Sequence, residues 1–307
     1  MKQTIILFKF LLWAYVLPAQ QSSQPYLLIL GTAQDGGFPH PGCTKPPCQS
    51  AWRHPSKRRN VVSLALVAPQ SKQWWLFEAT PDIREQLQLF RALTDSAYAY
   101  LPAGIFVTHA HIGHYTGLMQ LGREVLSTKN IPVYALPRMC AYLKQNGPWS
   151  QLVELQNIQI HQLAADSTIE IAPGVRVTAF TVPHRDEFSE TAGFRIDANG
   201  RNYLFIPDID KWEKWPRSIR TQVETVDVAL LDGTFFKDGE LANRNMKDVP
   251  HPFVQETMAM LQDLPAGTRR KVWFIHFNHT NPLLWDKKTR KEVWKAGFNV
   301  AEQGMRM

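Results

Sequence analysis

Three histidines stand close together near the middle of the chain, and no other feature constrains its fold as strongly. His109, His111 and His114 directly follow residues 104–108 (GIFVT), an apolar run that predicts a strand. Because side chains alternate along an extended chain, His109 and His111 project to the same side, and a turn at Gly113 can bring His114 to an adjacent face. Three neutral imidazoles can then bind one metal ion at ~2.0–2.1 Å. Helix capping explains the pattern less well, because one Ser, Thr, Asp or Asn is enough for a cap.

Short apolar or alternating segments surround this motif and predict a scaffold made largely of strands. The other predicted strands cover residues 26–32, 61–68, 74–79, 132–135, 157–163, 168–171, 175–182, 192–196, 203–206, 226–231 and 272–275. Helices are expected after Thr80, from about Tyr115, through Met139 and Leu143, at 253–261 and at 287–295. This interleaving favours two sheets sandwiched between helices, in one domain of residues 21–307.

Other side chains of metal-binding type follow predicted strands in the same way. His184, Asp208 and His276 each lie just beyond an apolar segment. Loops that a rigid scaffold holds at strand ends commonly carry chemistry. We therefore expect these three residues to lie near the histidine motif.

The order of these motifs resembles that of metallo-β-lactamase-fold hydrolases. The segment HAHIGH resembles the HxHxDH signature of that superfamily, with Gly113 where the family usually has Asp. The segments TVPHRDEFSETAGFRI, YLFIPD and VWFIHFNHTNP place His184, Asp208 and His276 at the family's later motifs. The resemblance implies an α/β fold, the metallo-β-lactamase-like αββα four-layer sandwich.

Other phrases are similar to those of a group within that superfamily, the coenzyme PQQ biosynthesis protein B group. They are GTAQDGGFP, FEATPDIREQL, HIGHYTGL and FIHFNHTNPLL. Two departures stand out. That group typically lacks the full first histidine motif, which is present here, and its cysteine-rich zinc knuckle is reduced here to Cys43 and Cys48.

The resemblance also implies how the candidate ligands divide between two metal positions. The residues concerned are His109, His111 and His184 for the first metal, His114 and His276 with the family's Asp for the second, and Asp208 as the bridge. Zinc, as one ion or two, is the implied cofactor, and iron or manganese is the alternative. Gly113 removes one carboxylate from the second position. Glu78 and Asp82 are candidate substitutes by position. For Asp82, a favourable charge at a helix start is the preferred explanation, whereas for Glu78 a ligand role and a structural role are about equally favoured.

These ligands predict a metal-dependent hydrolase that uses activated water, with a phosphodiester or an ester as substrate. Asp208 would orient the water, and His114 or His279 would exchange the proton in place of the missing Asp. An anionic small molecule could be held by Arg185 or by a basic loop. One alternative is an iron-dependent oxidative enzyme like PQQ biosynthesis protein B, and another is a non-catalytic metal-binding protein.

The N-terminal residues 1–20 have the pattern of a secretory signal peptide. Lys2 precedes an apolar run at residues 10–17, and cleavage is expected after Ala19 or Gln20. The apolar run is too short to span ~30 Å of hydrocarbon, so we expect export to the periplasm with no stable membrane insertion after signal removal. A buried first strand or a retained anchor is the alternative.

The formal net charge of +7 is mild for a chain of 307 residues. The densest basic run, RHPSKRR at residues 53–59, has only Trp52 beside it as a base-stacking residue. A solvated loop is therefore favoured, an anion-steering rim comes second, and no nucleic-acid partner is expected. The sequence does not predict an oligomeric state.

We expect structural roles for the remaining cysteines and histidines. Cys43 and Cys48 are close enough for a small disulfide, which an exported compartment favours, or for half of a zinc site completed by His40 and His54. Cys140 fits a buried apolar position. His161 lies in an alternating strand and His251 between two prolines, so we expect both to be structural.

Overall fold

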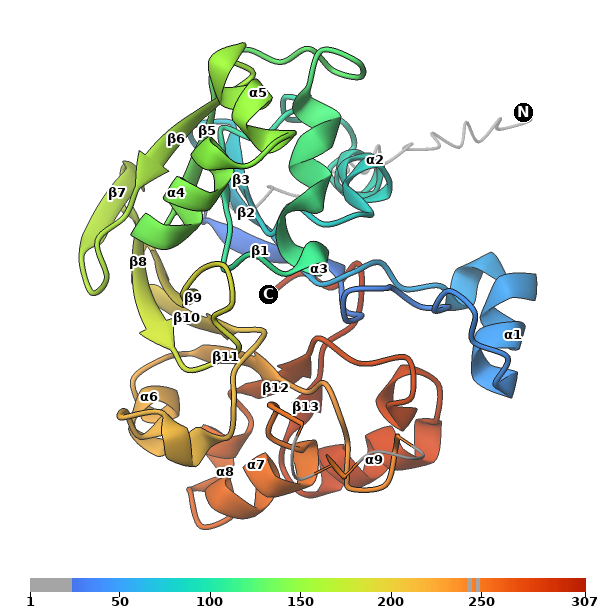
Figure 1. The fold of residues 1–307 in the computed structure, drawn as a ribbon. Coiled ribbons are helices and arrows are strands. Elements are labelled where there is room, and N and C mark those ends of the chain that lie inside the picture. Colours follow the sequence, from blue (N-terminus) through green and yellow to red (C-terminus); the bar gives the residue numbers. More distant parts are fainter. Residues whose placement is uncertain (1–23, 242–244, 247–248) are drawn as a thin grey trace, which may run out of the picture.

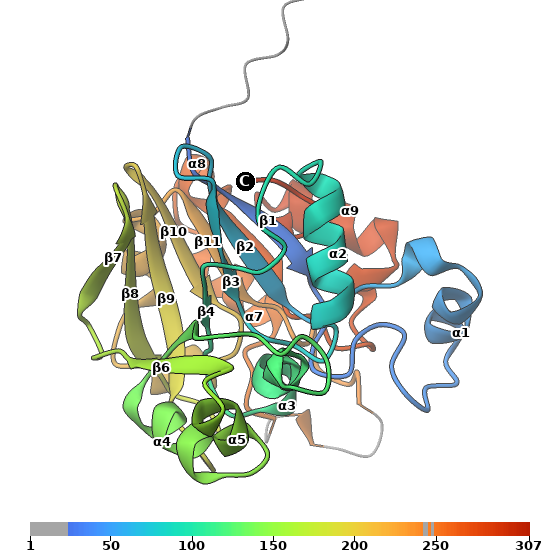
Figure 2. The ribbon, with the colours of Figure 1, turned by 90° about the horizontal axis from the view of Figure 1, so that it is seen from above.

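The computed structural model describes residues 24–241, 245–246 and 249–307. Two sheets face each other, and helices cover their outer faces (Figures 1 and 2). The signal peptide expected at residues 1–20 lies outside the described residues. Among the described residues, no helix is long and apolar enough to cross a membrane.

The first sheet has six strands in the order β1 to β6. They are β1 (Tyr26–Gly31), β2 (Ser63–Ala68), β3 (Gln73–Phe77), β4 (Gly104–Phe106), β5 (Ile131–Ala135) and β6 (Ile158–Gln162). The first three strands pair antiparallel, and β3 to β6 pair parallel.

The second sheet has seven strands in the order β13 to β7. They are β7 (Thr168–Ala172), β8 (Val175–Val182), β9 (Thr191–Ala198), β10 (Arg201–Ile206), β11 (Val228–Asp232), β12 (Val272–Ile275) and β13 (Asn299–Val300). Strands β7 to β10 pair antiparallel, and β10 to β13 pair parallel.

Helices form the two outer layers. Side chains of α2 (Ile83–Leu93), α4 (Pro137–Gln145) and α5 (Trp149–Glu154) share a buried cluster with the first sheet. Those of α6 (Ile219–Glu224), α7 (Val254–Leu261) and α9 (Lys287–Lys295) share one with the second sheet. The short helices α3 (Ile112–Tyr115) and α8 (Ala266–Arg269) complete these layers, and α1 (Pro46–Arg53) lies at the side of the sandwich (Figure 1).

Aromatic rings fill the space between the two sheets. Phe77 of β3 stacks on Phe106 of β4 at 4.7 Å, and Phe194 of β9 meets Phe77 edge-on at 5.4 Å. All three side chains are fully buried, which is worth about 1.5–3 kcal/mol for each ring. The expected αββα four-layer sandwich is therefore confirmed.

The topology gathers the candidate site residues at one end of the sandwich. Strands β3 and β4 are parallel, and β10, β11 and β12 are parallel to one another. Strand β8 pairs antiparallel with β9, which pairs antiparallel with β10, so β8 and β10 run the same way. The loops that follow these strands therefore leave at shared edges, where they can meet across the two sheets.

Several helical segments differ from expectation, and the short helices α5, α6 and α8 were not predicted. The helix expected from about Tyr115 is a single turn, α3, followed by a 3₁₀ segment at Thr116–Leu121. Gly117 packs so closely on the Thr80 carbonyl that a Cβ would lie 2.1 Å from its oxygen, and this contact fixes the tight path. Helix α1 was not predicted, because the segment PPCQSAWR has few apolar side chains, and Cys48 and Ala51 are the ones that it buries.

Candidate metal centre

Loops at one end of the sandwich bring seven imidazole and carboxylate side chains into two clusters. The first cluster is His109, His111, His184 and Asp208, and the second cluster is Asp35, His114 and His276. Within each cluster, one nitrogen or oxygen from each residue lies within 4.8 Å of the others. All six residues that the sequence suggested as ligands are present, and Asp35 is an addition.

The first cluster converges on a small volume. His109 Nε2 lies 2.8 Å from His111 Nδ1 and 3.4 Å from Asp208 Oδ2. His184 Nε2 lies 3.3 Å from Asp208 Oδ1. The alternation expected for His109 and His111 explains why two rings of one segment reach the same point.

The second cluster is completed by Asp35, from the loop after β1. A Cβ on Gly113 would lie 2.2 Å from Asp35 Oδ1 and 2.7 Å from the Asp35 Cα. Asp35 Oδ1 lies 3.6 Å from His114 Nε2. The carboxylate of Asp35 therefore occupies the space that a side chain at Gly113 would need, and an Asp at position 113 would compete with it.

Neither candidate substitute for that carboxylate joins the second cluster, because both have other partners. Asp82 accepts a hydrogen bond from the Val61 backbone N–H at 2.8 Å. Glu78 lies behind the histidines, fully buried, with Oε1 3.4 Å from His114 Nδ1 and Oε2 accepting from the Thr108 N–H at 3.3 Å. Glu78 thus orients His114 from the side opposite the cluster.

Hydroxyl groups orient two further histidines. Thr108 Oγ1 lies 2.8 Å from His109 Nδ1. Thr234 Oγ1 donates its proton to Asp232 Oδ1 at 2.7 Å, so it accepts from His276 Nδ1 at 2.8 Å. This arrangement leaves His276 Nε2 unprotonated and facing the cluster, as in metal sites where an outer partner fixes the ligand tautomer.

Left-handed backbone holds two residues of the site. Glu78 has φ of 74° and His276 has φ of 66°. Such values are uncommon for residues with a side chain, and they cluster at functional sites where the surrounding structure enforces them. Both residues follow directly on a strand, so this conformation turns each side chain toward His114.

Asp208 lies between the two clusters. Its Oδ2 is 3.5 Å from His114 Nε2 and 3.8 Å from His276 Nε2, while its Oδ1 faces His184. Burial alone would raise the pKa of Asp208, but His184, His276 and His251 outweigh it and hold the pKa well below its usual value. Asp208 is therefore an ionised carboxylate that lies close to histidines of both clusters.

Several buried atoms of the site have no hydrogen-bond partner. They include His114 Nε2, His276 Nε2, Asp35 Oδ1 and Asp208 Oδ1. A buried polar atom without a partner costs about 1–3 kcal/mol. Cations bound by these atoms would remove that cost, and a set of imidazoles and carboxylates suits zinc, iron or manganese. The donor set therefore fits the implied metal.

His251 and Asp232 form a third group that the sequence interpretation missed. His251 Nδ1 donates to Asp232 Oδ2 at 2.9 Å and lies 3.2 Å from Asp208 Oδ1. Burial lowers the pKa of His251, but Asp232 and Asp208 outweigh it and raise the pKa overall. The structural interpretation of His251 was therefore wrong. The available signal was Asp232, which ends the apolar strand VALLD much as Asp208 follows YLFIP.

His279 lies apart from both clusters. Its ring stacks on His40 at 4.2 Å between centroids. Burial, together with His40 and Lys45, lowers the pKa of His279 to about 4.

The disulfide expected between Cys43 and Cys48 is not formed, because both are free cysteines. Cys48 lies on the buried side of α1, and burial with a hydrogen bond to Cys43 raises the pKa of Cys48 to about 11. Among the described residues, no cluster with metal-binding geometry includes Cys43, Cys48, His40 or His54. Cys140 is buried, as expected.

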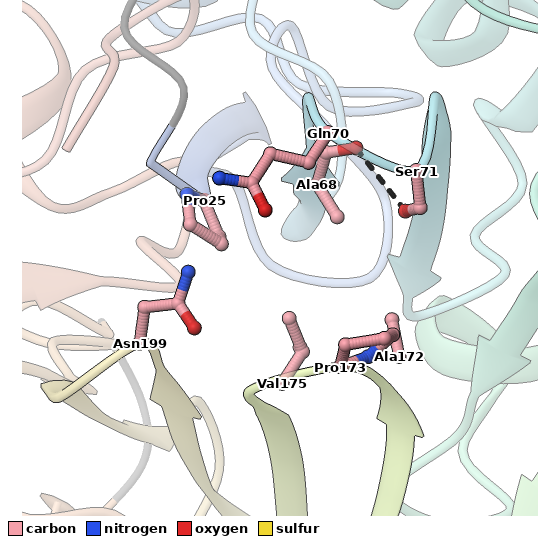
Figure 3. Close-up of a pocket in the computed structure, with 8 residues that line it drawn as sticks. All are labelled: Pro25, Ala68, Gln70, Ser71, Ala172, Pro173, Val175 and Asn199. Carbon is pink, nitrogen blue, oxygen red and sulfur yellow. Dashed lines mark hydrogen bonds between the residues drawn. The ribbon is translucent and has the colours of Figure 1, made fainter.

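A cavity of about 260 Å³ lies at the other end of the sandwich (Figure 3). Its lining includes Gln70 and Ser71 from the β2–β3 turn, Pro173 from the β7–β8 turn and Asn199 from the β9–β10 turn. These turns precede β3, β8 and β10, whereas His184 and Asp208 of the first cluster follow β8 and β10 at the opposite end. This cavity is therefore separate from the site.

Two facing sheets with His/Asp clusters at one end define the class of this protein, which belongs to the metallo-β-lactamase superfamily. The family model described as the beta-lactamase superfamily domain matches residues 73–277. The expected family is thereby confirmed. The match covers most of both clusters and begins after Asp35.

Within the superfamily, the chain is similar to coenzyme PQQ synthesis protein B. It is 29% identical to that protein of Methylobacterium sp. (strain 4-46) over 304 residues, which cover 91% of this chain and 98% of the relative. The corresponding protein of Methylorubrum extorquens (strain PA1) is 27% identical over 305 residues, with the same coverage.

Two solved structures share the fold. The Zn²⁺-bound PqqB from Methylobacterium extorquens has a TM-score of 0.75 and 25% identity, covering 92% of this chain and 99% of that one. A structure described as a new diphosphatase from the PhnP family has a TM-score of 0.67 and 20% identity, covering 92% and 96%. At 20% identity, the similarity to the second structure shows a shared fold alone.

Proposed function

We propose that the protein is a metal-dependent hydrolase that binds two metal ions and acts on a phosphodiester or an ester. The observation that carries this proposal is the position of Asp35, which supplies the second cluster with the carboxylate that Gly113 lacks. His109, His111 and His184 would bind the first metal, Asp35, His114 and His276 the second, and Asp208 both. The absence of a carboxylate at position 113 therefore gives no reason to favour a non-catalytic metal-binding protein.

Metal ions held by these residues would lower the pKa of a bound water and polarise the substrate oxygen. The chain's own residues fix the geometry. Thr234, Glu78 and Thr108 orient the imidazoles, and the anionic Asp208 is placed to orient an attacking water. Arg185 is exposed beside His184 and is available to an anionic substrate.

We propose that His251, and not His114, donates a proton to the leaving group. The two ring nitrogens of His114 face Glu78 and Asp35. Asp232 holds Nδ1 of His251, which leaves Nε2 to exchange a proton. A histidine oriented by a carboxylate suits general acid catalysis, which contributes about 10²–10⁴-fold to a rate. His251→Asn should therefore lower kcat by about that factor at unchanged metal content, and loss of metal in this variant would contradict the assignment.

The hydrolase proposal is tested by turnover of bis(4-nitrophenyl) phosphate and 4-nitrophenyl acetate, with metal content measured on the same samples. We expect turnover that disappears on chelation and returns with zinc or manganese. His109→Ala and His184→Ala should be inactive, and His161→Ala, on β6 and outside the clusters, serves as the matched control. Full activity in both of the first two variants would overturn the proposal.

An oxidative function is the second candidate, favoured by the similarity to coenzyme PQQ synthesis protein B over 91% of the chain. Imidazole and carboxylate ligands suit iron as well as zinc. Oxygen uptake that requires iron and fails with zinc, without turnover of either ester, would favour this candidate over hydrolysis.

We propose export to the periplasm from the N-terminal sequence, with a small molecule as the partner. N-terminal sequencing of the protein from a periplasmic fraction tests this proposal. A first residue near position 20 is expected, and an intact Lys2 in a cytoplasmic fraction would contradict it.

A further inference from the structure

A second cavity, of about 400 Å³, lies between α1, the segment that follows α1 and the start of α9. It is lined by Phe38, Pro47, Ser50, Lys57, Arg59, Leu284, Trp285, Lys287 and Arg290. None of these residues belongs to the His/Asp clusters. The volume lies in the range of small-molecule sites, roughly 300–1,000 Å³.

Four cationic side chains line this cavity, and no carboxylate does. Arg59 donates to the backbone carbonyls of Ser56 and Arg58 at 2.9 and 2.7 Å. Among the described residues, Lys287 has no hydrogen-bond or ion-pair partner. One carboxylate outside the lining pairs with these cations, because Glu302 accepts a hydrogen bond from Arg290 Nη1 at 2.6 Å. The cavity therefore has excess positive charge.

The two guanidinium groups face a common space. Burial, followed by the charge of Arg290, lowers the pKa of Arg59. Arg290 Nε is buried without a hydrogen-bond partner. Two arginines brought together in this way suit a multivalent oxyanion such as phosphate, whose oxygens accept paired N–H donors.

An aromatic surface lies beside these charges. Trp285 stacks on Phe38 with 5.9 Å between ring centroids and 17° between their planes. Phe38 is buried, whereas Trp285 is 37% exposed. Phe38 covers one face of the Trp285 ring, and part of Trp285 remains exposed. Trp285 therefore offers a flat apolar surface on which a ligand ring can stack.

We propose that this cavity binds a small anion that carries an aromatic ring, with a nucleoside monophosphate as the fitting class. Arg59, Arg290 and Lys287 contact the phosphate, and Trp285 contacts the ring. Lys57 and Arg59 belong to the basic run at residues 53–59. Because both line this cavity, this part of the run is more than a solvated loop. This site is separate from the metal centre and does not depend on the proposed hydrolysis.

Isothermal titration of the full chain with AMP, adenosine and inorganic phosphate tests the proposal, with and without chelator. We expect AMP to bind in both conditions, and more tightly than adenosine or phosphate. Arg59→Ala and Lys287→Ala should each weaken AMP binding about tenfold, as expected for loss of a charge-assisted hydrogen bond. Trp285→Leu should weaken binding of AMP but not of phosphate.

Arg53→Ala is the matched control, because it removes the same charge from the end of α1 without touching the cavity. Lys287 is exposed and unpartnered, so its variant should fold normally, as thermal unfolding will verify. Absence of AMP binding, its loss on chelation, or equal AMP affinity in Lys287→Ala, Arg59→Ala and the native protein would overturn the proposal.

Discussion

The two clusters at the end of the sandwich have similar chemistry but are assembled differently. The first takes two of its four residues from one extended segment, His109 and His111. The second takes His114 from the same motif but obtains its carboxylate from the loop after β1. The difference shows that a short motif can specify part of a ligand set by side-chain alternation alone. A carboxylate that is missing from the motif can instead come from a distant loop, which packs where the Cβ of that residue would lie.

The largest expected effect comes from breaking each cluster in turn. His184→Ala removes a ligand of the first cluster and His276→Ala one of the second, so each should lose hydrolytic activity to background. Each variant should keep the metal of the other cluster, because only Asp208 is shared. Metal analysis by mass spectrometry alongside the activity assay checks this result. Loss of all metal from both variants would show that the clusters are not separable.

A smaller perturbation sharpens the comparison without touching a ligand. Gly113→Ala places a Cβ against Asp35 Oδ1 and Cα, so Asp35 must shift. We expect weaker binding of the second metal alone and a cost of about 1–3 kcal/mol in the free energy of unfolding. Gly267→Ala, where nothing lies within 4 Å, is the control. Unchanged metal affinity would place the second metal elsewhere.

Thr234→Val tests the group that orients His276. It removes the hydroxyl that accepts from His276 Nδ1, and such outer partners are worth about 10–100-fold in metal affinity. Thr128→Val removes a buried hydroxyl far from the clusters, which donates to the Asn157 carbonyl, and should lower stability without changing metal affinity. Competition with a chromogenic chelator measures both. Equal affinities would mean that Thr234 only stabilises the fold.

The smallest effect concerns His279 in metal-free protein. Its pKa in the folded state is lowered to about 4, whereas the unfolded value is near 6.5. Between these values the unfolded chain binds a proton that the folded chain does not, so His279 costs stability as pH falls from about 6.5 to 4. His279→Asn should therefore flatten the decline of the unfolding midpoint in this window. A parallel decline in both proteins would contradict the shift.

Much of this structure could be predicted from local sequence. All twelve predicted strands are present, because apolar runs and alternation are local signals, and so are the six suggested ligands at strand ends. Asp35 and His251 could not be placed, because each reaches the site through a loop whose path depends on packing. Asp35 lies in a glycine-rich turn and His251 between two prolines. In such segments neither hydrophobic periodicity nor secondary-structure propensity predicts where a side chain points.

The central claim is that Asp35 completes a second metal position in place of Gly113. The most direct test is the metal stoichiometry of the native protein and of Asp35→Ala, purified without a metal-affinity tag and loaded with zinc. Two ions per chain in the native protein and one in Asp35→Ala are predicted, with Asp82→Ala retaining two. A single ion in the native protein, or two in Asp35→Ala, would contradict the claim.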